Sequence, residues 1–258
     1  VPTTWDQTIP FFTALQAGGA ASGFGADVGW DTYTGQNLGI YAHQAGSTLM
    51  NADQTKWVLD DPAVVKAIDY TTAPFTSGVS SVDGPTFLDA QPYFVDGKTG
   101  SMISGPWVIA SLDTTAKKEG WTAEHVGTAE LPKGPDNGSS ELGGGSWVVN
   151  KNSKNASSAW KVVRAMAQKD TQIAQFKAFG SMPAVADAWT DESITKNPLY
   201  DAFLTQLKDI KAMPPVASWG QLSTAIGKEL EQVARKVETP EQAAKNLQTQ
   251  ADAIGVGN

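Results

Sequence analysis

Three of the nine tryptophans in this 258-residue chain stand where a predicted loop or strand gives way to a helix. Trp30 follows Gly29, Trp107 follows Pro106 and Trp219 follows Ser218. A flat indole in such a place can stack on the apolar face of a sugar ring, while polar neighbours bind the hydroxyls. Packing in a core explains each ring equally well, because aromatic side chains are often buried. The three residues are therefore candidate sugar platforms.

Other chemistry has less support. The two histidines, His43 and His125, lack the spacing of a metal-binding pair, and the chain has no cysteine. Residues 23–29 miss the dinucleotide-binding glycine spacing by one position, and there is neither a P-loop nor a Gly-x-Ser-x-Gly elbow. We therefore expect no catalytic residue, no metal and no cofactor. Acidic residues are numerous, so a glycosidase carboxylate pair stays open, although helix capping or solvated surface explains most of them.

The composition predicts a soluble protein that does not bind nucleic acid. There are 19 basic and 27 acidic residues, for a formal net charge of −8, and the pI is near 4.7. Only Arg164 and Arg235 are arginines, which argues against a surface that neutralises phosphates. No apolar run approaches the roughly 18 residues of a membrane span. The first residues lack a signal core, so we expect any targeting segment to have been removed or to lie upstream.

Helix signals recur with strand-sized segments between them, which predicts a mixed α/β fold. Asp61-Pro62 and Thr239-Pro240 each join a capping residue to proline at the first helical position. The first of these helices should stop before Pro74. One apolar face is predicted from Leu222, Ile226, Leu230, Val233 and Val237.

Further helices are expected from Thr4 to Gly18, from about 36 to 44, around Trp160 and from Asp170 to Gly180. Short strands are expected at 20–27, 99–104 and 147–150.

In their order along the chain, the motifs resemble the extracellular solute-binding proteins of bacterial ABC importers, in the sugar-binding, maltose-binding-protein-like group. The most diagnostic stretch is Phe94 to Trp107, which is similar to the Phe-x-x-Gly-Lys and Gly-Pro-Trp motifs of that family. It departs at Gly100 and Ser101, where the family usually has Ala and Met. The other matching stretches are Pro2 to Asp6, Asp61 to Ala67, Leu131-Pro132, Gly144-Gly145, Ala159-Trp160, Gly180 to Ala184, Pro214 to Trp219 and Pro240 to Ala243.

The resemblance implies an α/β fold of the periplasmic-binding-protein type, which has two lobes. Residues 1–145 and 190–258 would form the second, C-terminal lobe, and residues 146–189 would be a returning segment of the first, N-terminal lobe. In the family the Pro-x-Thr-Trp segment lies well inside the chain. We therefore expect this sequence to be a fragment that lacks most of the first lobe.

The ligand of this family lies in the cleft between the lobes. The resemblance implies that the indoles stack on the ligand, that two carboxylates accept bonds from its hydroxyls, and that two glycines let the backbone approach it. Carried over by position, these ligand-binding residues are Asp27, Trp30, Asp31, Trp107, Gly144, Gly145 and Trp219.

The implied function is that of an extracytoplasmic receptor, in the periplasm or anchored as a cell-surface lipoprotein. It would capture a sugar or oligosaccharide and deliver it unchanged to the permease subunits of an ABC transporter. Since closure needs contacts from both lobes, we expect this chain alone to bind sugar weakly or not at all. The apolar face of the Trp160 helix further predicts self-association.

Two alternatives belong to other classes of protein. A carbohydrate-active enzyme or carbohydrate-binding module would share the loop tryptophans and the acidic groups. A structural or interaction protein would use its tryptophans only in its core, and its fluorescence would not respond to sugars.

Overall fold

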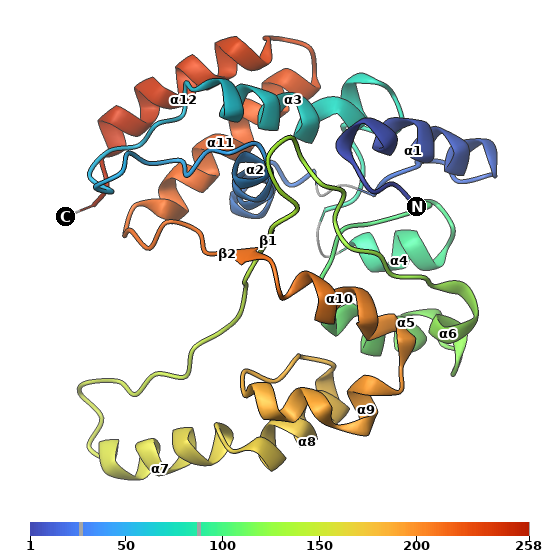
Figure 1. Cartoon of the computed structure of the whole chain (residues 1–258), viewed down its shortest axis with the longest axis vertical. Coiled ribbons are helices and arrows are strands. Elements are labelled where there is room, and N and C mark those ends of the chain that lie inside the picture. Colours follow the sequence, from blue (N-terminus) through green and yellow to red (C-terminus); the bar gives the residue numbers. More distant parts are fainter. Residues whose placement is uncertain (26–27, 87–88, 258) are drawn as a thin grey trace. The chain divides into compact units, whose positions relative to one another are not determined.

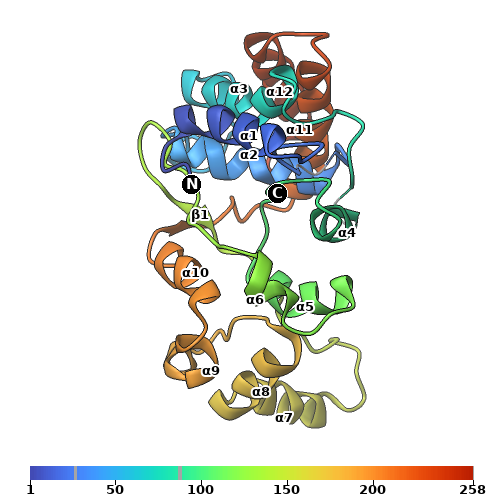
Figure 2. The ribbon, with the colours of Figure 1, turned by 90° about the vertical axis from the view of Figure 1, so that its right-hand side faces the viewer.

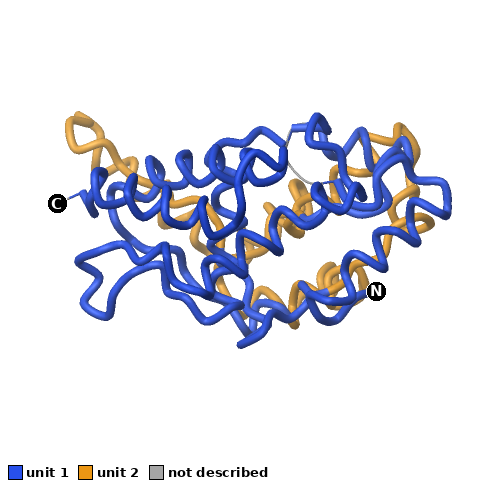
Figure 3. The backbone as a smooth tube through the Cα atoms, turned by 90° about the horizontal axis from the view of Figure 1, so that it is seen from above, with its two compact units in different colours: residues 1–103, 130–142, 206–258 blue, residues 104–129, 143–205 orange. Residues whose placement is uncertain are grey.

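The computed structural model describes residues 1–25, 28–86 and 89–257 of the chain. This described part is mainly helical and divides into two compact units (Figure 1, Figure 3). Unit 1 consists of residues 1–103, 130–142 and 206–258, and unit 2 consists of residues 104–129 and 143–205.

Unit 2 includes the predicted returning segment, 146–189, together with residues on both sides of it. Compactness alone does not assign a unit to a lobe. The predicted lobes, 1–145 with 190–258 against 146–189, therefore stay a prediction.

Unit 1 holds the longest helices and the paired strands. Its helical elements are η1 (Trp5–Gln7), α1 (Thr8–Ala17), α2 (Thr32–Gln44), α3 (Pro62–Thr76), α4 (Ala90–Val95), α11 (Trp219–Ala234) and α12 (Pro240–Ile254). The strands β1 (Ser140–Glu141) and β2 (Ile210–Lys211) pair in parallel, with Ser140 opposite Ile210.

Unit 2 is helical throughout its described elements. These are α5 (Trp107–Ala116), α6 (Trp121–His125), α7 (Ala156–Met166), α8 (Lys169–Phe179), η3 (Ala186–Thr190), α9 (Glu192–Thr195) and η4 (Pro198–Tyr200). The helix α10 (Asp201–Gln206) follows where the chain returns to unit 1.

The core of unit 1 is built around α2. Figure 2 shows α2 gathered with α3, α11 and α12; α11 contacts the other three helices, and α3 also contacts α2 and α12. Each contributes a fully buried apolar side chain, respectively Leu38, Ile68, Leu230 and Leu247. Complete burial of such a side chain stabilises the fold by about 1.5–3 kcal/mol. This bundle therefore supports the segments that precede α2 and α11, up to residues 31 and 218.

Two predicted helix starts are confirmed. Asp61 caps α3, because its carboxylate accepts from the amides of Ala63 and Val64 at 2.7 and 2.9 Å. Thr239 caps α12 by accepting from the amide of Gln242 at 3.3 Å. Each cap satisfies backbone N–H groups that have no partner within the helix.

The predicted end of α3 is wrong. The helix continues through Pro74 to Thr76. Since it ends two residues after the proline, the missing N–H removes a bond only near the C-terminus. Pro74 and Phe75 are both buried, so packing of the last turn favours continuation.

The predicted strands are represented only by short pairings within the described residues. Ser22 donates its amide to the Lys98 carbonyl at 2.9 Å, and Gly25 donates to Ser101 at 2.7 Å. These contacts join the predicted strands 20–27 and 99–104 in parallel as isolated bridges. The segment 147–150 forms no strand. The absence of a strand there shows that β-propensity alone did not decide pairing.

Unit 2 has a smaller core. Leu112, Phe176, Ile194 and Tyr200 are buried, and the rings of Phe176 and Tyr200 lie 5.0 Å apart between centroids. Gly180 ends α8 in the left-handed conformation with φ +71°, as predicted.

The α7 helix presents apolar side chains to solvent. It has no buried residue, and Trp160 and Val162 are exposed. Among the described residues, no helix has both the length and the apolar character required to cross a membrane.

Candidate ligand-binding site

Trp30 lies in the loop before α2 and is buried. Only 8% of its surface is exposed, and its ring packs on Phe75 with centroids 5.1 Å apart. Its φ of +48° is in the left-handed region, which is unusual for a bulky residue. The indole Nε1 is buried without a hydrogen-bond partner among the described residues. The surrounding core therefore holds this residue in a strained conformation.

A glycine of α11 makes that conformation of the loop possible. A Cβ on Gly227 would lie 2.5 Å from the Asp31 carbonyl oxygen and 2.8 Å from the Trp30 carbonyl carbon. Thr32, which follows Asp31, is also held by α11, because the Ser223 hydroxyl donates to the Thr32 carbonyl oxygen at 2.8 Å. The loop backbone thus lies directly against α11.

Asp31 is exposed and serves as the N-cap of α2. Its Oδ1 accepts from the Tyr33 amide at 2.8 Å. This bond fixes the carboxylate at the first turn of α2, where the helix dipole favours a negative charge. Tyr33, on the same turn, has 55% of its surface exposed. Tyr33 was not among the residues selected from the sequence, although its position three residues after Trp30 was the available signal.

Trp219 is the first residue of α11 and is partly buried against the unit 1 core. Its ring lies 6.0 Å from that of Trp57 between centroids. Its Cη2 atom would lie 3.5 Å from a Cβ on Gly39 of α2. Gly227 comes eight residues later on the same helix, so Trp219 and the Trp30–Asp31 backbone are separated by about 12 Å along the helix axis. Unit 1 therefore carries Trp30, Asp31 and Trp219 on one helix pair.

Trp107 is the first residue of α5, in unit 2, and has 45% of its surface exposed. Its ring lies back over Gly105, where any side chain would collide with it. Its carbonyl oxygen would lie 3.3 Å from a Cβ on Gly180. Two glycines thus define the position of this exposed indole.

The remaining predicted site residues are less defined by their surroundings. Gly144 and Gly145 lie in unit 2 in an exposed extended segment, and no atom would come within 4 Å of a Cβ on either. Asp27 lies outside the described residues. Trp30, Asp31 and Trp219 therefore all lie in unit 1, where only Trp30 and Asp31 are adjacent, and Trp107, Gly144 and Gly145 belong to unit 2.

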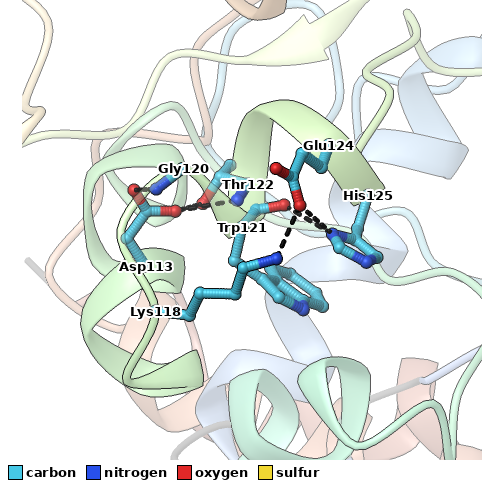
Figure 4. Close-up of polar contacts among 7 residues, drawn as sticks. All are labelled: Asp113, Lys118, Gly120, Trp121, Thr122, Glu124 and His125. Atoms are coloured by element: carbon cyan, nitrogen blue, oxygen red, sulfur yellow. Dashed lines mark hydrogen bonds and ion pairs between the residues drawn. The ribbon is translucent and has the colours of Figure 1, made fainter.

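A polar cluster follows Trp107 on α5 and α6 (Figure 4). Asp113 accepts from the amides of Gly120 and Thr122 and from the Thr122 hydroxyl. The hydroxyl bond, followed by the two amide bonds, holds the pKa of Asp113 below its usual value. These bonds attach the start of α6 to α5.

The exposed side of this cluster carries an ion pair and an aromatic pair. Lys118 Nζ lies 2.7 Å from Glu124 Oε2. The rings of Trp121 and His125 stack with centroids 4.8 Å apart and planes at 6°. Exposed ion pairs stabilise a fold little, so the contacts that attach α6 to α5 are chiefly the hydrogen bonds of Asp113.

No group of three or more His, Cys, Asp or Glu side chains suited to a metal ion occurs within the described ranges. His43 is partly buried, and burial lowers its pKa, followed by the nearby Lys211 charge. That environment favours a neutral structural histidine.

The fold is that of the two-lobe solute-binding proteins. The chain is similar to the sugar-binding protein MalE of Xanthomonas citri, with TM-score 0.81 and 21% identity over 98% of this chain and 64% of that one. It is also similar to an ABC transporter solute-binding protein of Thermotoga lettingae bound with α-D-tagatose, with TM-score 0.84, 23% identity and the same coverage. The predicted α/β periplasmic-binding-protein-like fold is confirmed, with few strands in the described part.

The chain belongs to the family of bacterial extracellular solute-binding proteins, which it matches over residues 1–202. A putative binding protein of Brucella abortus is 25% identical over 260 residues, covering 98% of this chain and 61% of the relative. The galactooligosaccharide-binding protein of Bacillus subtilis is 26% identical over 176 residues, covering 67% of this chain and 40% of the relative.

The chain thus spans about three fifths of the length of the Brucella relative it matches. The family resemblance inferred from motif order is confirmed. The family is described as one of bacterial extracellular solute-binding proteins, and some of the similar proteins are described as solute-binding proteins of ABC transporters. They are binding proteins rather than enzymes.

Proposed function

We propose that this chain takes part in capturing a sugar or oligosaccharide for an ABC importer, without making or breaking covalent bonds. The observation that carries the proposal is the exposed indole of Trp107, at the start of a helix in a chain of the solute-binding family. An exposed flat ring suits the apolar face of a sugar. Structural relatives described as sugar-binding, and one bound with tagatose, support this ligand class.

The residues of unit 1 have different proposed roles. Asp31 is exposed and would accept bonds from sugar hydroxyls, with Tyr33 as an exposed aromatic beside it. Trp30 exposes too little surface to serve as a platform in this conformation, which agrees with the packing alternative left open by the sequence. Its proposed contribution is to set the position of the loop that carries Asp31.

Trp219 offers only part of its ring, because Trp57 and the unit 1 core occupy the rest. Gly144 and Gly145 would allow close backbone approach, since neither carries a side chain in an exposed extended segment. Asp27 keeps its proposed role as a hydroxyl acceptor. Each of these residues is proposed separately as a polar or aromatic contact of the ligand, and none of them as a member of an acid–base pair.

In the proposed mechanism, the sugar binds one conformation of the whole receptor more tightly than another and shifts the population toward it. The receptor then docks on the membrane permease outside the cytoplasm and releases the sugar unchanged. A shift from 1:99 to 99:1 requires about 5.5 kcal/mol of differential binding. Because this must come from contacts on both sides of a cleft, we propose that the present chain binds sugar only weakly.

The test is an NMR titration of indole N–H signals with tagatose, maltose and galactooligosaccharides, and with an amino acid as the negative control. A Kd near or above about 1 mM, equivalent to about −4 kcal/mol, is expected. Trp107→Ala should remove the sugar response. Trp160→Ala is the matched control, because Trp160 on α7 is exposed to a similar extent, 47% against 45%.

Three results would contradict the proposal. An unchanged response in Trp107→Ala would exclude this indole as the platform. Turnover of oligosaccharide would point to the enzyme alternative. Binding with a Kd near 1 μM, about −8 kcal/mol, would refute the requirement for a second set of contacts.

A further inference from the structure

Two carboxylates approach each other where α11 turns into α12, on the described part of unit 1. Glu229 lies on α11, and Glu238 lies in the turn just before α12. Both accept from the same side-chain amide, because Asn246 Nδ2 lies 2.8 Å from Glu238 Oε2 and 3.4 Å from Glu229 Oε2. One donor thus serves two acids that are nine residues apart.

The orientation of that amide is set by its other end. Gln242 Nε2 donates to Asn246 Oδ1 at 2.9 Å, so the Nδ2 group faces the two acids. Gln250 Nε2 donates to Glu229 Oε1 at 2.6 Å. Three polar side chains of α12 therefore support the pair, and Glu229 receives two of their bonds.

One carboxylate oxygen is left without a donor. Glu238 Oε1 is buried and has no hydrogen-bond partner among the described residues. A buried, unpaired anionic oxygen is costly, whereas a protonated carboxyl can donate to its neighbour. Two close carboxylates resolve this by keeping one proton between them.

The charges around the pair provide incomplete compensation. Asp69 on α3 and Lys236 in the turn line the same groove of about 420 Å³ as Glu238. Arg235 is engaged by Glu231 at 2.8 Å and by Asp83 at 3.0 Å. On the exposed first turns of α12, the two charged groups are Glu241 and Lys245, of opposite sign.

We propose that Glu229 and Glu238 share one proton, and that its loss to solvent loosens the turn between α11 and α12. When the pair is protonated, one carboxyl donates to the other and both accept from Asn246. These bonds hold the turn against α12. Deprotonated, two negative charges compete for one amide and repel each other. Burial, and then the neighbouring Glu229, raises the pKa of Glu238 to about 7, which locates this change near neutral pH. The inference rests on unit 1 alone and does not depend on the ligand.

Hydrogen exchange of the amides from 235 to 242, corrected for the intrinsic effect of pH, tests the proposal. Protection in the wild-type chain should fall by about tenfold between pH 6 and pH 8, because the proton occupancy of a group with a pKa of about 7 falls about tenfold over that range. Glu238→Gln imitates the protonated acid and should stay protected at both pH values. Glu119→Gln, at an exposed position of unit 2, makes the same chemical change away from the pair and should behave as wild type.

A second measurement keeps the test independent of the variant's folding. In the wild-type chain, ¹³C NMR of the glutamate carboxyls should show a group titrating near pH 7, and Glu229→Gln should move that titration toward the ordinary range. Constant protection from pH 6 to pH 8, an equal loss in Glu238→Gln, or the absence of a carboxyl titrating near 7 would each overturn the shared proton.

Discussion

The approach of the Trp30–Asp31 backbone to α11 depends on Gly227 having no side chain. In Gly227→Ala, the new Cβ would lie 2.5 Å from the Asp31 carbonyl oxygen and 2.9 Å from the Asp31 amide nitrogen. Both are backbone atoms, which no side-chain rotation can move aside. Since ordinary contacts are about 3.5–4 Å, the loop and the helix must separate by about 1 Å.

The energetic effect combines two opposite contributions. Overpacking a core contact costs about 1–3 kcal/mol. Replacing glycine by alanine inside a helix returns about 1 kcal/mol. We therefore expect Gly227→Ala to lower the free energy of unfolding by up to about 2 kcal/mol, which lowers Tm by up to roughly 8 °C for a domain of this size.

Gly220→Ala on the same helix is the matched control. No atom would lie within 4 Å of a Cβ at Gly220, and both glycines belong to α11. The control should gain up to about 1 kcal/mol from helix propensity alone. Urea unfolding followed by tryptophan fluorescence and by circular dichroism would measure both variants. Equal stabilisation in the two would refute the close approach of loop and helix.

Three other substitutions test the core, a cap and an acid-sensitive contact. Leu247→Ala should destabilise unit 1 by about 2–5 kcal/mol in urea unfolding, because the side chain is fully buried. Asp61→Ala should cost about 0.5–2 kcal/mol in the same assay, since two amides of α3 lose their acceptor. Hydrogen bonds from Thr122 and Gly120 hold the pKa of Asp113 below its unfolded value of 3.8. The ionised carboxylate therefore stabilises the fold at pH values above 3.8, and this stabilisation is lost as the pH falls through the folded pKa. Asp113→Ala should therefore show a shallower loss of Tm on acidification than wild type.

Each of these has a distinct control. Val237→Ala, at an exposed position, should change stability by no more than about 0.5 kcal/mol. Asp61→Asn retains an oxygen acceptor and should recover part of the cap. For Asp113, the control is the pH dependence of Tm. If Tm falls on acidification equally in the alanine variant and in wild type, this carboxylate does not determine the stability of unit 2 at low pH.

The sequence predicted those parts of the fold that depend on neighbours within one helical turn. Asp61 and Thr239 cap their helices because a side-chain oxygen three residues or fewer from an amide can reach it in any context. The apolar stripe on α11 was also correct from Leu222 to Val233, which are buried. Val237 was assigned to the same face, but the helix ends at Ala234 and this side chain is exposed.

Burial of particular aromatic rings could not be predicted in this way. Trp30 and Trp107 carry the same kind of local signal, a small residue or proline before an indole at a helix start. The first is buried because Phe75 and the backbone opposite Gly227 enclose it. The second is exposed. Their environments differ through residues far away in the sequence, which local spacing does not encode.

The sequence by itself determined the family, through the order of its motifs, the negative charge, through its composition, and the starts of α3 and α12, through short-range hydrogen bonds. Only the tertiary structure decided which indole is available to a ligand and that Glu229 and Glu238 meet beside Asn246. The physical reason is that exposure and proton affinity depend on desolvation and on charges brought together by packing. Those quantities are properties of the folded chain, in which residues from separate helices share one environment.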